Sequence, residues 1–206
     1  VTGVQTCALP IFCFMAFLLI LSMLIYNGVI GYMPPVEELM HPRDRYATTI
    51  YTSDGVEMGK FYRSKGNRSY VDFEQMSPHL KDALVATEDV RFEQHSGIDV
   101  RAIFRSIIKR VILGKHSAGG GSTITQQLIK NTILSSEQSY KRKIQEAYLA
   151  LELEKMIGKD EILEAYLNDI YLGQSNYGVK TAAKDYFGKE LSELTVRECA
   201  MLAGLP

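Results

Sequence analysis

Two short runs of this chain carry the groups that could do chemistry. Residues 88–97 begin with the pair Glu88 and Asp89, close to the expected end of a helix. Residues 119–127 hold three glycines followed by hydroxyl and amide side chains, at the expected start of another helix. A carboxylate can serve as a general base, and free N–H groups at a helix N-terminus after a glycine-rich turn attract anions. The two runs together predict a base that faces an anion-binding pocket.

Each run also has a plainer interpretation. Glu88 and its neighbour could form a solvated helix end, and His95 could simply fix a loop through a hydrogen bond. The glycines could be a flexible linker in front of an N-cap at Ser122. They do not form a nucleotide-binding loop, because the glycine–lysine–serine pattern of that motif is missing. If Ser122, Gln126 and Lys130 share one helical face, that face favours a site for hydroxyls and phosphate.

A third group, Arg142, Lys143 and Glu146, would lie on one side of a long helix. A structural salt bridge is the simple explanation, but such a pair contributes only about 0.2–0.5 kcal/mol, and the favoured order puts the acid before the base. Here the order is reversed. We therefore interpret the group as a cationic cluster for a diphosphate, with Glu146 holding the cluster or a metal ion.

The charge pattern indicates an anionic ligand other than nucleic acid. The net charge of −1 lacks the basic excess that is typical of nucleic-acid binders. Residues 103–113 are basic and amphipathic, which fits either a core helix or an interfacial helix on anionic lipid. Residues 100–136 contain no Asp or Glu and attract anions locally through the basic side chains Arg101, Arg105, Lys109, Arg110, Lys115 and Lys130.

The N-terminal segment is predicted to anchor the chain in a membrane. Residues 1–36 carry no charge, and residues 12–33 are apolar and long enough to cross a hydrocarbon core of about 30 Å. A signal peptide is the alternative, although its apolar part is usually only ~7–15 residues. Residues 1–11 resemble the translation of a sequencing adapter and are left out of the fold prediction. The cysteines predict neither a disulfide framework nor a metal site, and they are Cys7, Cys13 and Cys199.

The elements that must position these groups begin with a short sheet. Residues 34–76 are expected to form a linker and a hairpin, in which residues 46–51 and 56–62 flank a turn at Asp54–Gly55. Residues 69–73 could add another short extended piece. Residues 77–206 form the expected main domain, which we predict to be truncated because the chain ends directly after a helix.

Capping residues predict where the helices of this domain begin and end. Helices are expected from Ser77–Pro78 to Glu88, from Asp99 to Gly114, from near Ser122, from a Ser135–Gln138 capping box to about Met156, from Lys159 to Leu172, from Gly178 to Phe187, and from a Thr195–Glu198 capping box to Gly204. The predicted fold class is mainly α, with one short β-hairpin and one transmembrane helix in front.

Five ordered runs resemble the family 51 glycosyltransferases, the peptidoglycan polymerase domain of class A penicillin-binding proteins and monofunctional transglycosylases. The runs are residues 88–97, 121–127, 142–146, 162–168 and 200–206, which read EDVRFEQHSG, GSTITQQ, RKIQE, ILEAYLN and AMLAGLP. Five motifs in the family's order are far more specific than any one of them. The anchor and the hairpin are also similar to class A members, which favours a bifunctional parent protein.

The resemblance implies a lysozyme-like, mostly helical fold with a large lobe and a small membrane-facing jaw between the first two motifs. It implies that Glu88 deprotonates the 4-hydroxyl of the acceptor sugar on lipid II, and that this oxygen attacks C1 of the donor strand. The undecaprenyl diphosphate carrier leaves, the anomeric centre is inverted, and a β-1,4-linked glycan grows. A diphosphate is already a good leaving group, so one base with electrostatic stabilisation is sufficient.

The resemblance also implies roles for particular residues. Two carboxylates, Glu88 and Glu146, would be catalytic. Glu146 and the neighbouring cations would hold the diphosphate directly or through a divalent cation, Mg²⁺ or Mn²⁺. The implied substrate-binding set is Asp89, Phe92, His95, Ser122, Thr123, Thr125, Gln126, Gln127, Lys130, Asn131, Arg142, Lys143, Tyr166 and Asn168.

The implied location is the bacterial plasma membrane, crossed once, with the catalytic domain on the extracytoplasmic side. The implied partners are lipid II, the growing lipid-linked glycan strand, the bilayer and other cell-wall synthesis and division proteins, without any nucleic acid. The rival functions are a monofunctional transglycosylase, a lysozyme-like lytic enzyme and an inactive membrane-tethered scaffold. A lytic enzyme often needs a second carboxylate at the scissile bond, and it has no need for a cluster of cations that binds diphosphate.

Overall fold

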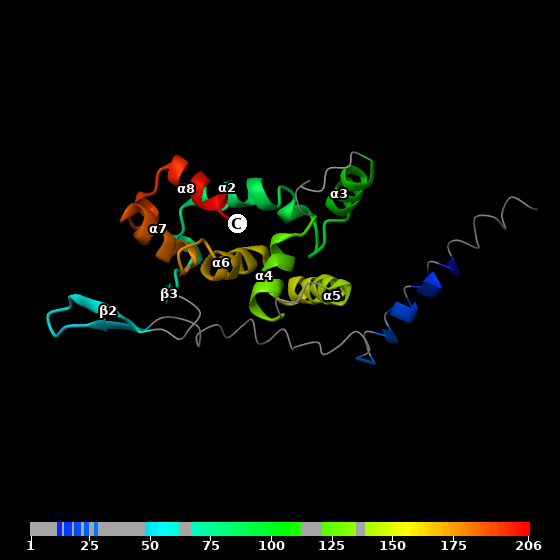
Figure 1. Ribbon diagram of the computed structural model, residues 1–206, viewed down its shortest axis with the longest axis horizontal. Coiled ribbons are helices and arrows are strands. Elements are labelled where there is room, and N and C mark those ends of the chain that lie inside the picture. The colour runs from blue at the N-terminus through cyan, green and yellow to red at the C-terminus, as the bar shows by residue number, and fades with distance from the viewer. Residues whose placement is uncertain are drawn as a thin grey trace, which may run out of the picture.

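The computed structural model describes residues 48–61, 67–112, 121–134 and 139–206, together with short stretches between residues 12 and 28. Most of the described chain is helical, as the sequence predicts (Figure 1). The anchor predicted at residues 12–33 is described only in part, because residues 14, 18, 22, 25–26 and 29–33 lie outside the described residues. Across the described stretches, no helix combines the length and the apolar character that crossing a bilayer requires.

The predicted hairpin is confirmed. β1 (Thr48–Tyr51) pairs antiparallel with β2 (Glu57–Phe61). The turn between them contains Asp54 and Gly55, and Gly55 has a φ of +83°, a left-handed conformation that glycine adopts without steric cost. The Asp-Gly pattern was therefore sufficient to place this turn.

A second small sheet joins the start of the domain to a distant loop. β3 (Asn67–Arg68) pairs in parallel with β4 (Asn176–Tyr177). The Arg68 guanidinium also forms an ion pair with Asp169 at 2.9 Å. The extended piece predicted at residues 69–73 is misplaced, because the strand lies just before it and depends on a partner more than a hundred residues away in sequence.

The helices of the described residues follow the predicted order. They are α2 (Pro78–Glu88), α3 (Val100–Ile112), α4 (Ile124–Thr132), α5 (Tyr140–Met156), α6 (Lys159–Asp169), α7 (Val179–Phe187) and α8 (Val196–Ala203), with the 3-10 turns η3 (Phe73–Gln75), η4 (Phe92–Gln94) and η5 (Leu191–Glu193). Several predicted caps are confirmed. Asp99 Oδ1 accepts the Ala102 N–H at 3.0 Å, and the Thr195 N–H donates to the Glu198 carboxylate at 2.7 Å in a capping box.

The structure corrects one predicted helix limit, the end of α6, and refines two others. α4 is capped by Thr123 rather than Ser122, because the Thr123 hydroxyl accepts the Gln126 N–H at 3.2 Å. α5 is capped by Ser139, whose hydroxyl accepts the Arg142 N–H at 3.1 Å, whereas the proposed capping box at residues 135–138 lies outside the described residues. α6 ends before Leu172, because the Leu172 N–H donates instead to the Asn176 carbonyl at 2.9 Å.

One hydrophobic core holds the helices together. α2 packs on α8, and α4 packs on both α5 and α6 (Figure 1). Burying each large apolar side chain contributes about 1.5–3 kcal/mol, so the core fixes α4 firmly against its neighbours. The largest fully buried side chains are Tyr166, Phe92, Met76, Leu80, Leu84, Ile124, Leu128, Ile129, Leu149, Leu153, Ile162 and Leu167.

Candidate active site

A cleft of about 580 Å³ opens between the end of α2, the first part of α3 and the start of α4. Gly121 lines it where the chain runs close to α3, and a Cβ at Gly121 would lie 3.2 Å from the Cα of Ile103. The structure therefore brings the two runs singled out in the sequence together around one cleft. Its lining comprises Ala86, Thr87, Glu88, Asp89, Val90, Asp99, Ala102, Arg105, Gly121, Ser122, Thr123, Gln127 and Lys130.

Glu88 is half-buried at the end of α2 and is held by a chain of hydrogen bonds. Gln127 Nε2 donates to Glu88 Oε2 at 2.7 Å, and the Tyr166 hydroxyl donates to Gln127 Oε1 at 3.1 Å. A carboxylate only accepts hydrogen bonds, so the amide must turn its NH₂ group toward Glu88. Burial, and then the negative charge of Glu88, raise the pKa of Tyr166 far above its ordinary value. Tyr166 is therefore a neutral donor that orients Gln127.

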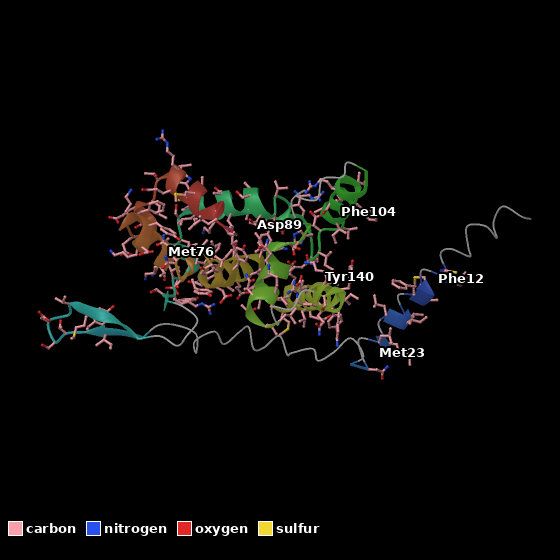
Figure 2. All side chains as sticks on the ribbon, in the orientation of Figure 1. Phe12, Met23, Met76, Asp89, Phe104 and Tyr140 are labelled. Atoms are coloured by element: carbon pink, nitrogen blue, oxygen red, sulfur yellow. The ribbon has the colours of Figure 1, made fainter. Side chains whose placement is uncertain are left out.

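Asp89 joins α2 to the start of α4. Its side chain is buried, and its Oδ2 lies 2.9 Å from His95 Nε2 and accepts the Ile124 N–H at 3.1 Å. Figure 2 labels Asp89 at the junction between these helices. Because Oδ2 is already engaged twice, the geometry gives Asp89 and His95 a supporting role beside Glu88.

The start of α4 is built from internal hydrogen bonds. The Thr123 hydroxyl donates to the Gly97 carbonyl at 2.7 Å, and Gln126 Oε1 accepts the Thr123 N–H at 3.1 Å. The Thr125 hydroxyl donates to Glu154 at 2.6 Å. Gln126 and Thr125 are buried and lie outside the cleft lining. Of the helical face predicted to hold the ligand, Ser122 and Lys130 line the cleft. Gln126 does not, because its side chain caps the start of α4, and Thr123 and Gln127 line the cleft instead.

The cluster on α5 is compact. Glu146 is fully buried and forms ion pairs with Arg142 at 3.0 Å and with Lys143 at 2.5 Å. Lys143 Nζ also lies 2.7 Å from the Ser122 hydroxyl, which lines the cleft. Half of the Lys143 side chain is exposed. The arrangement places Lys143 at the edge of the cleft, and Glu146 holds both Lys143 and Arg142 on α5.

The donor set around Glu146 does not fit a divalent cation in this arrangement. Its carboxylate faces Arg142 on one oxygen and Lys143 on the other. Among the residues that the structure describes, no group of three His, Cys, Asp or Glu side chains is placed to hold a metal ion. The predicted Mg²⁺ or Mn²⁺ stays a prediction, and we derive no chemical step through it.

Two further cations face the cleft directly. Lys130 comes from α4 and was predicted, whereas Arg105 comes from α3 and was not assigned to the site. Among the described residues, neither side chain forms an ion pair with a carboxylate. The acid-free stretch that contains Arg105 was the signal that could have found it.

Three more residues of the predicted set, Phe92, Asn131 and Asn168, also lie outside the cleft lining. Phe92 is fully buried in the core, edge-on to the His95 ring. Asn168 bonds the backbone of Val71 through both amide atoms at 2.9 Å. Asn131 is exposed on α4. The geometry gives Phe92 and Asn168 structural contacts instead.

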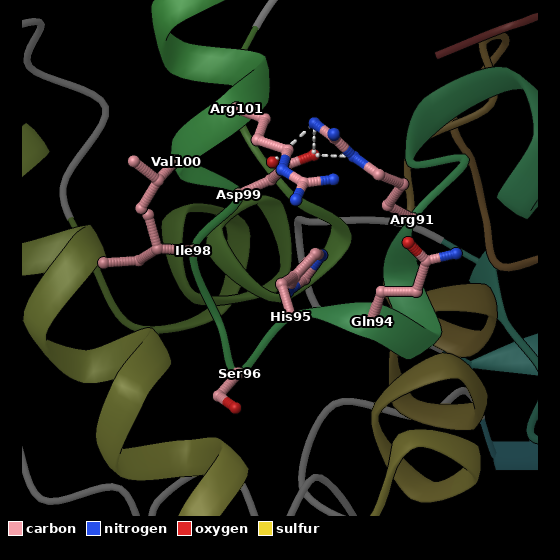
Figure 3. A pocket seen from close by; sticks show the side chains of 8 residues that line it. All are labelled: Arg91, Gln94, His95, Ser96, Ile98, Asp99, Val100 and Arg101. Carbon is pink, nitrogen blue, oxygen red and sulfur yellow. Dashed lines mark hydrogen bonds and ion pairs between the residues drawn. The ribbon is translucent and has the colours of Figure 1, made fainter.

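A second cavity of about 380 Å³ lies beyond Asp99, which it shares with the main cleft. Figure 3 shows Arg91 and Asp99 joined in a two-pronged ion pair, with the shortest N–O distance 2.6 Å. Burial acts to raise the pKa of Asp99, but the Ala102 N–H and Arg91 outweigh it and hold that pKa below its ordinary value. This ion pair fixes the start of α3 beside the site.

Comparison with known proteins identifies the family. The transglycosylase family profile matches residues 54–206, about three quarters of the chain. Penicillin-binding protein 1A of Neisseria flavescens is 45% identical over 84% of this chain, and penicillin-binding protein 1A of Escherichia coli (strain K12) is 42% identical over 88% of it. The aligned part covers 21% of each relative, so the chain spans about a fifth of their length. The chain belongs to the transglycosylase family.

Proposed function

We propose that this chain is the catalytic part of a peptidoglycan glycosyltransferase that polymerises lipid II into β-1,4-linked glycan, within a class A penicillin-binding protein. Its family and its similarity to proteins named penicillin-binding protein 1A support the proposal. The observation that carries it is the composition of the cleft. One oriented carboxylate, Glu88, shares that cleft with Lys130 and Arg105, two cations that form no ion pair among the described residues.

Glu88 is proposed as the general base. Gln127 occupies its Oε2, and among the described residues nothing is hydrogen-bonded to Oε1. That oxygen accepts the proton of the acceptor's 4-hydroxyl. The acceptor O4 then forms a bond to the donor C1 while the bond between C1 and the diphosphate oxygen breaks. The electron pair leaves with the lipid diphosphate, and attack from the opposite side inverts C1.

The cations are proposed to stabilise the leaving group. Negative charge grows on the diphosphate as the glycosidic bond breaks, and fixed positive groups stabilise such charge most in a site shielded from water. Lys130 and Arg105 line the cleft, and Lys143 reaches its edge through Ser122. No second protonated carboxyl is needed, because a diphosphate leaves readily.

The surface of α3 supports a membrane location. Val100, Phe104 and Ile108 are spaced four residues apart, and each is more than half exposed. Figure 2 shows Phe104 on this helix. Exposed apolar side chains next to Arg101 and Arg105 are typical of a helix that rests on anionic lipid. Together with the uncharged residues 12–33, they support a membrane-anchored enzyme that draws its lipid-linked substrate from the bilayer.

The direct test is incubation of the complete protein with lipid II in detergent, followed by gel separation of the products by glycan length. We expect a ladder of glycan strands that lysozyme digests, with release of undecaprenyl diphosphate. Shortening of preformed glycan without any new polymer would assign a lytic activity instead. Absence of both reactions would favour the scaffold.

A further inference from the structure

We propose that Glu154 is a positioning residue for this site: its buried carboxylate holds the first turn of α4 and thereby keeps Gln127 against Glu88. Glu154 lies on α5, outside the cleft lining. Its effect on catalysis rests on the proposed function, whereas its effect on the structure does not.

Glu154 joins four elements of the fold. Its side chain is only 5% exposed and forms an ion pair with Lys159 at 2.7 Å, on the first turn of α6. The Thr125 hydroxyl of α4 donates to its Oε1 at 2.6 Å. Lys159 Nζ in turn lies 4.3 Å from the centre of the Phe92 ring in η4. One carboxylate therefore ties α5, α6 and α4 together and, through Lys159, reaches the 3-10 turn after Glu88.

His95 lies between two carboxylates. Its Nε2 is 2.9 Å from Asp89 Oδ2, and its Nδ1 is 4.0 Å from Glu154 Oε1. A carboxylate only accepts, so Nε2 carries the hydrogen toward Asp89. Nδ1 is buried and has no hydrogen bond among the described residues. The negative charge of Glu154 is therefore the polar group that this nitrogen faces. Glu154 thus also acts on the His95–Asp89 contact.

The two carboxylates hold adjacent residues of α4. Asp89 accepts the Ile124 N–H at 3.1 Å, and Glu154 accepts the Thr125 hydroxyl at 2.6 Å. Gln127 follows in the same helical turn and reaches Glu88 at 2.7 Å. Hydrogen bonds weaken steeply with poor geometry, so a small shift of this turn would loosen Gln127 from Glu88. The structure therefore makes the orientation of the base depend on Glu154.

The test compares Glu154→Gln with Glu152→Gln in the complete protein. Glu152 lies on the same helix, is partly exposed and pairs only with Lys155 among the described residues, so it is a matched control. Glu154→Gln keeps an oxygen for Thr125 but loses the charge that faces Lys159 and His95. We expect kcat for lipid II polymerisation to fall by about tenfold to a hundredfold with KM nearly unchanged, and the control to match wild type.

Hydrogen exchange gives a readout that does not need activity. In Glu154→Gln we expect faster exchange at the Ile124 amide. Exchange in α8 should be unchanged, because among the described residues no hydrogen bond or ion pair joins α8 to Glu154, Thr125 or Lys159. Thr125→Val, which removes only the hydroxyl, should lower kcat in the same way and keep the proposal testable if the first variant folds poorly. Unchanged kcat and unchanged Ile124 exchange in the folded variants would overturn the proposal. An inactive wild type would overturn the proposed function, and the exchange result would still decide the role of Glu154.

Discussion

Replacement of Tyr166 by phenylalanine tests whether the hydrogen-bond chain behind Glu88 controls the base. The substitution removes one hydroxyl from a residue that is 1% exposed and leaves the ring in place. Gln127 then loses the donor that fixes its amide at 3.1 Å, while its contact with Glu88 at 2.7 Å stays within reach. The amide becomes free to rotate away from the carboxylate.

The expected losses in rate and in Tm follow from the loss of one hydrogen bond. A buried neutral hydrogen bond contributes about 1 kcal/mol net, and Gln127 is only half-buried, so water in the cleft can replace part of the loss. One kcal/mol corresponds to roughly fivefold in a rate constant. The same loss lowers Tm by about 2–4 °C in a domain of this size.

Tyr186 provides a matched control. Its hydroxyl donates to the Leu172 carbonyl at 2.6 Å, and it belongs to α7, away from the cleft lining. We expect Tyr166→Phe and Tyr186→Phe to lower Tm similarly in thermal denaturation. Only Tyr166→Phe should lower kcat by roughly fivefold in the polymerisation assay. An equal kcat loss in both variants, or none in Tyr166→Phe, would refute the reasoning.

Three further substitutions test the packing around the site. Glu146→Gln leaves two cations without their partner, so thermal unfolding should show a loss of about 3 kcal/mol in the free energy of unfolding. This is the lower end of the cost of breaking a buried ion pair, because Lys143 is half exposed. A loss no larger than that of an exposed ion pair would contradict this. Asp99→Asn should lower Tm at neutral pH. The Tm difference from wild type should shrink as pH falls below the ordinary carboxyl pKa of 3.8, because the contacts that lower the pKa of Asp99 stabilise the folded state only while Asp99 is ionised. A Tm difference that persists in acid would argue against the ion pair. Gly97→Ala should lower the free energy of unfolding, measured with denaturant, by about 1–3 kcal/mol. The reason is that φ at Gly97 is +93° and the new Cβ would lie 2.5 Å from the Ala150 carbonyl oxygen. Stability near that of wild type would show that the turn relaxes.

Local signals predicted most of the fold. The Asp54–Gly55 turn and the Thr195–Glu198 capping box act within a few residues, and both occur as expected. The cap of α4 was missed by one residue, because Ser122 and Thr123 are both acceptable N-caps. The choice between them depends on Gly97, whose carbonyl accepts the Thr123 hydroxyl across 26 positions of the sequence.

The candidate site was predicted as a set of residues but without its internal order. The motifs assign both Glu88 and Gln127 to the site, but only the fold shows that their side chains are hydrogen-bonded to each other. Sequence patterns also cannot show that Glu146 is fully buried between two cations. Long-range packing of α4 against α5 and α6 decides both points.

The central claim is that Glu88 takes the proton from the acceptor sugar. The most direct measurement is the single-turnover rate of lipid II polymerisation by Glu88→Gln, with Glu93→Gln, an exposed acid of the same run, as control. Loss of a general base should reduce the rate by about 10²–10⁴-fold, with donor binding and Tm retained and the control unaffected. A Glu88→Gln variant that polymerises lipid II at the wild-type rate would contradict the account.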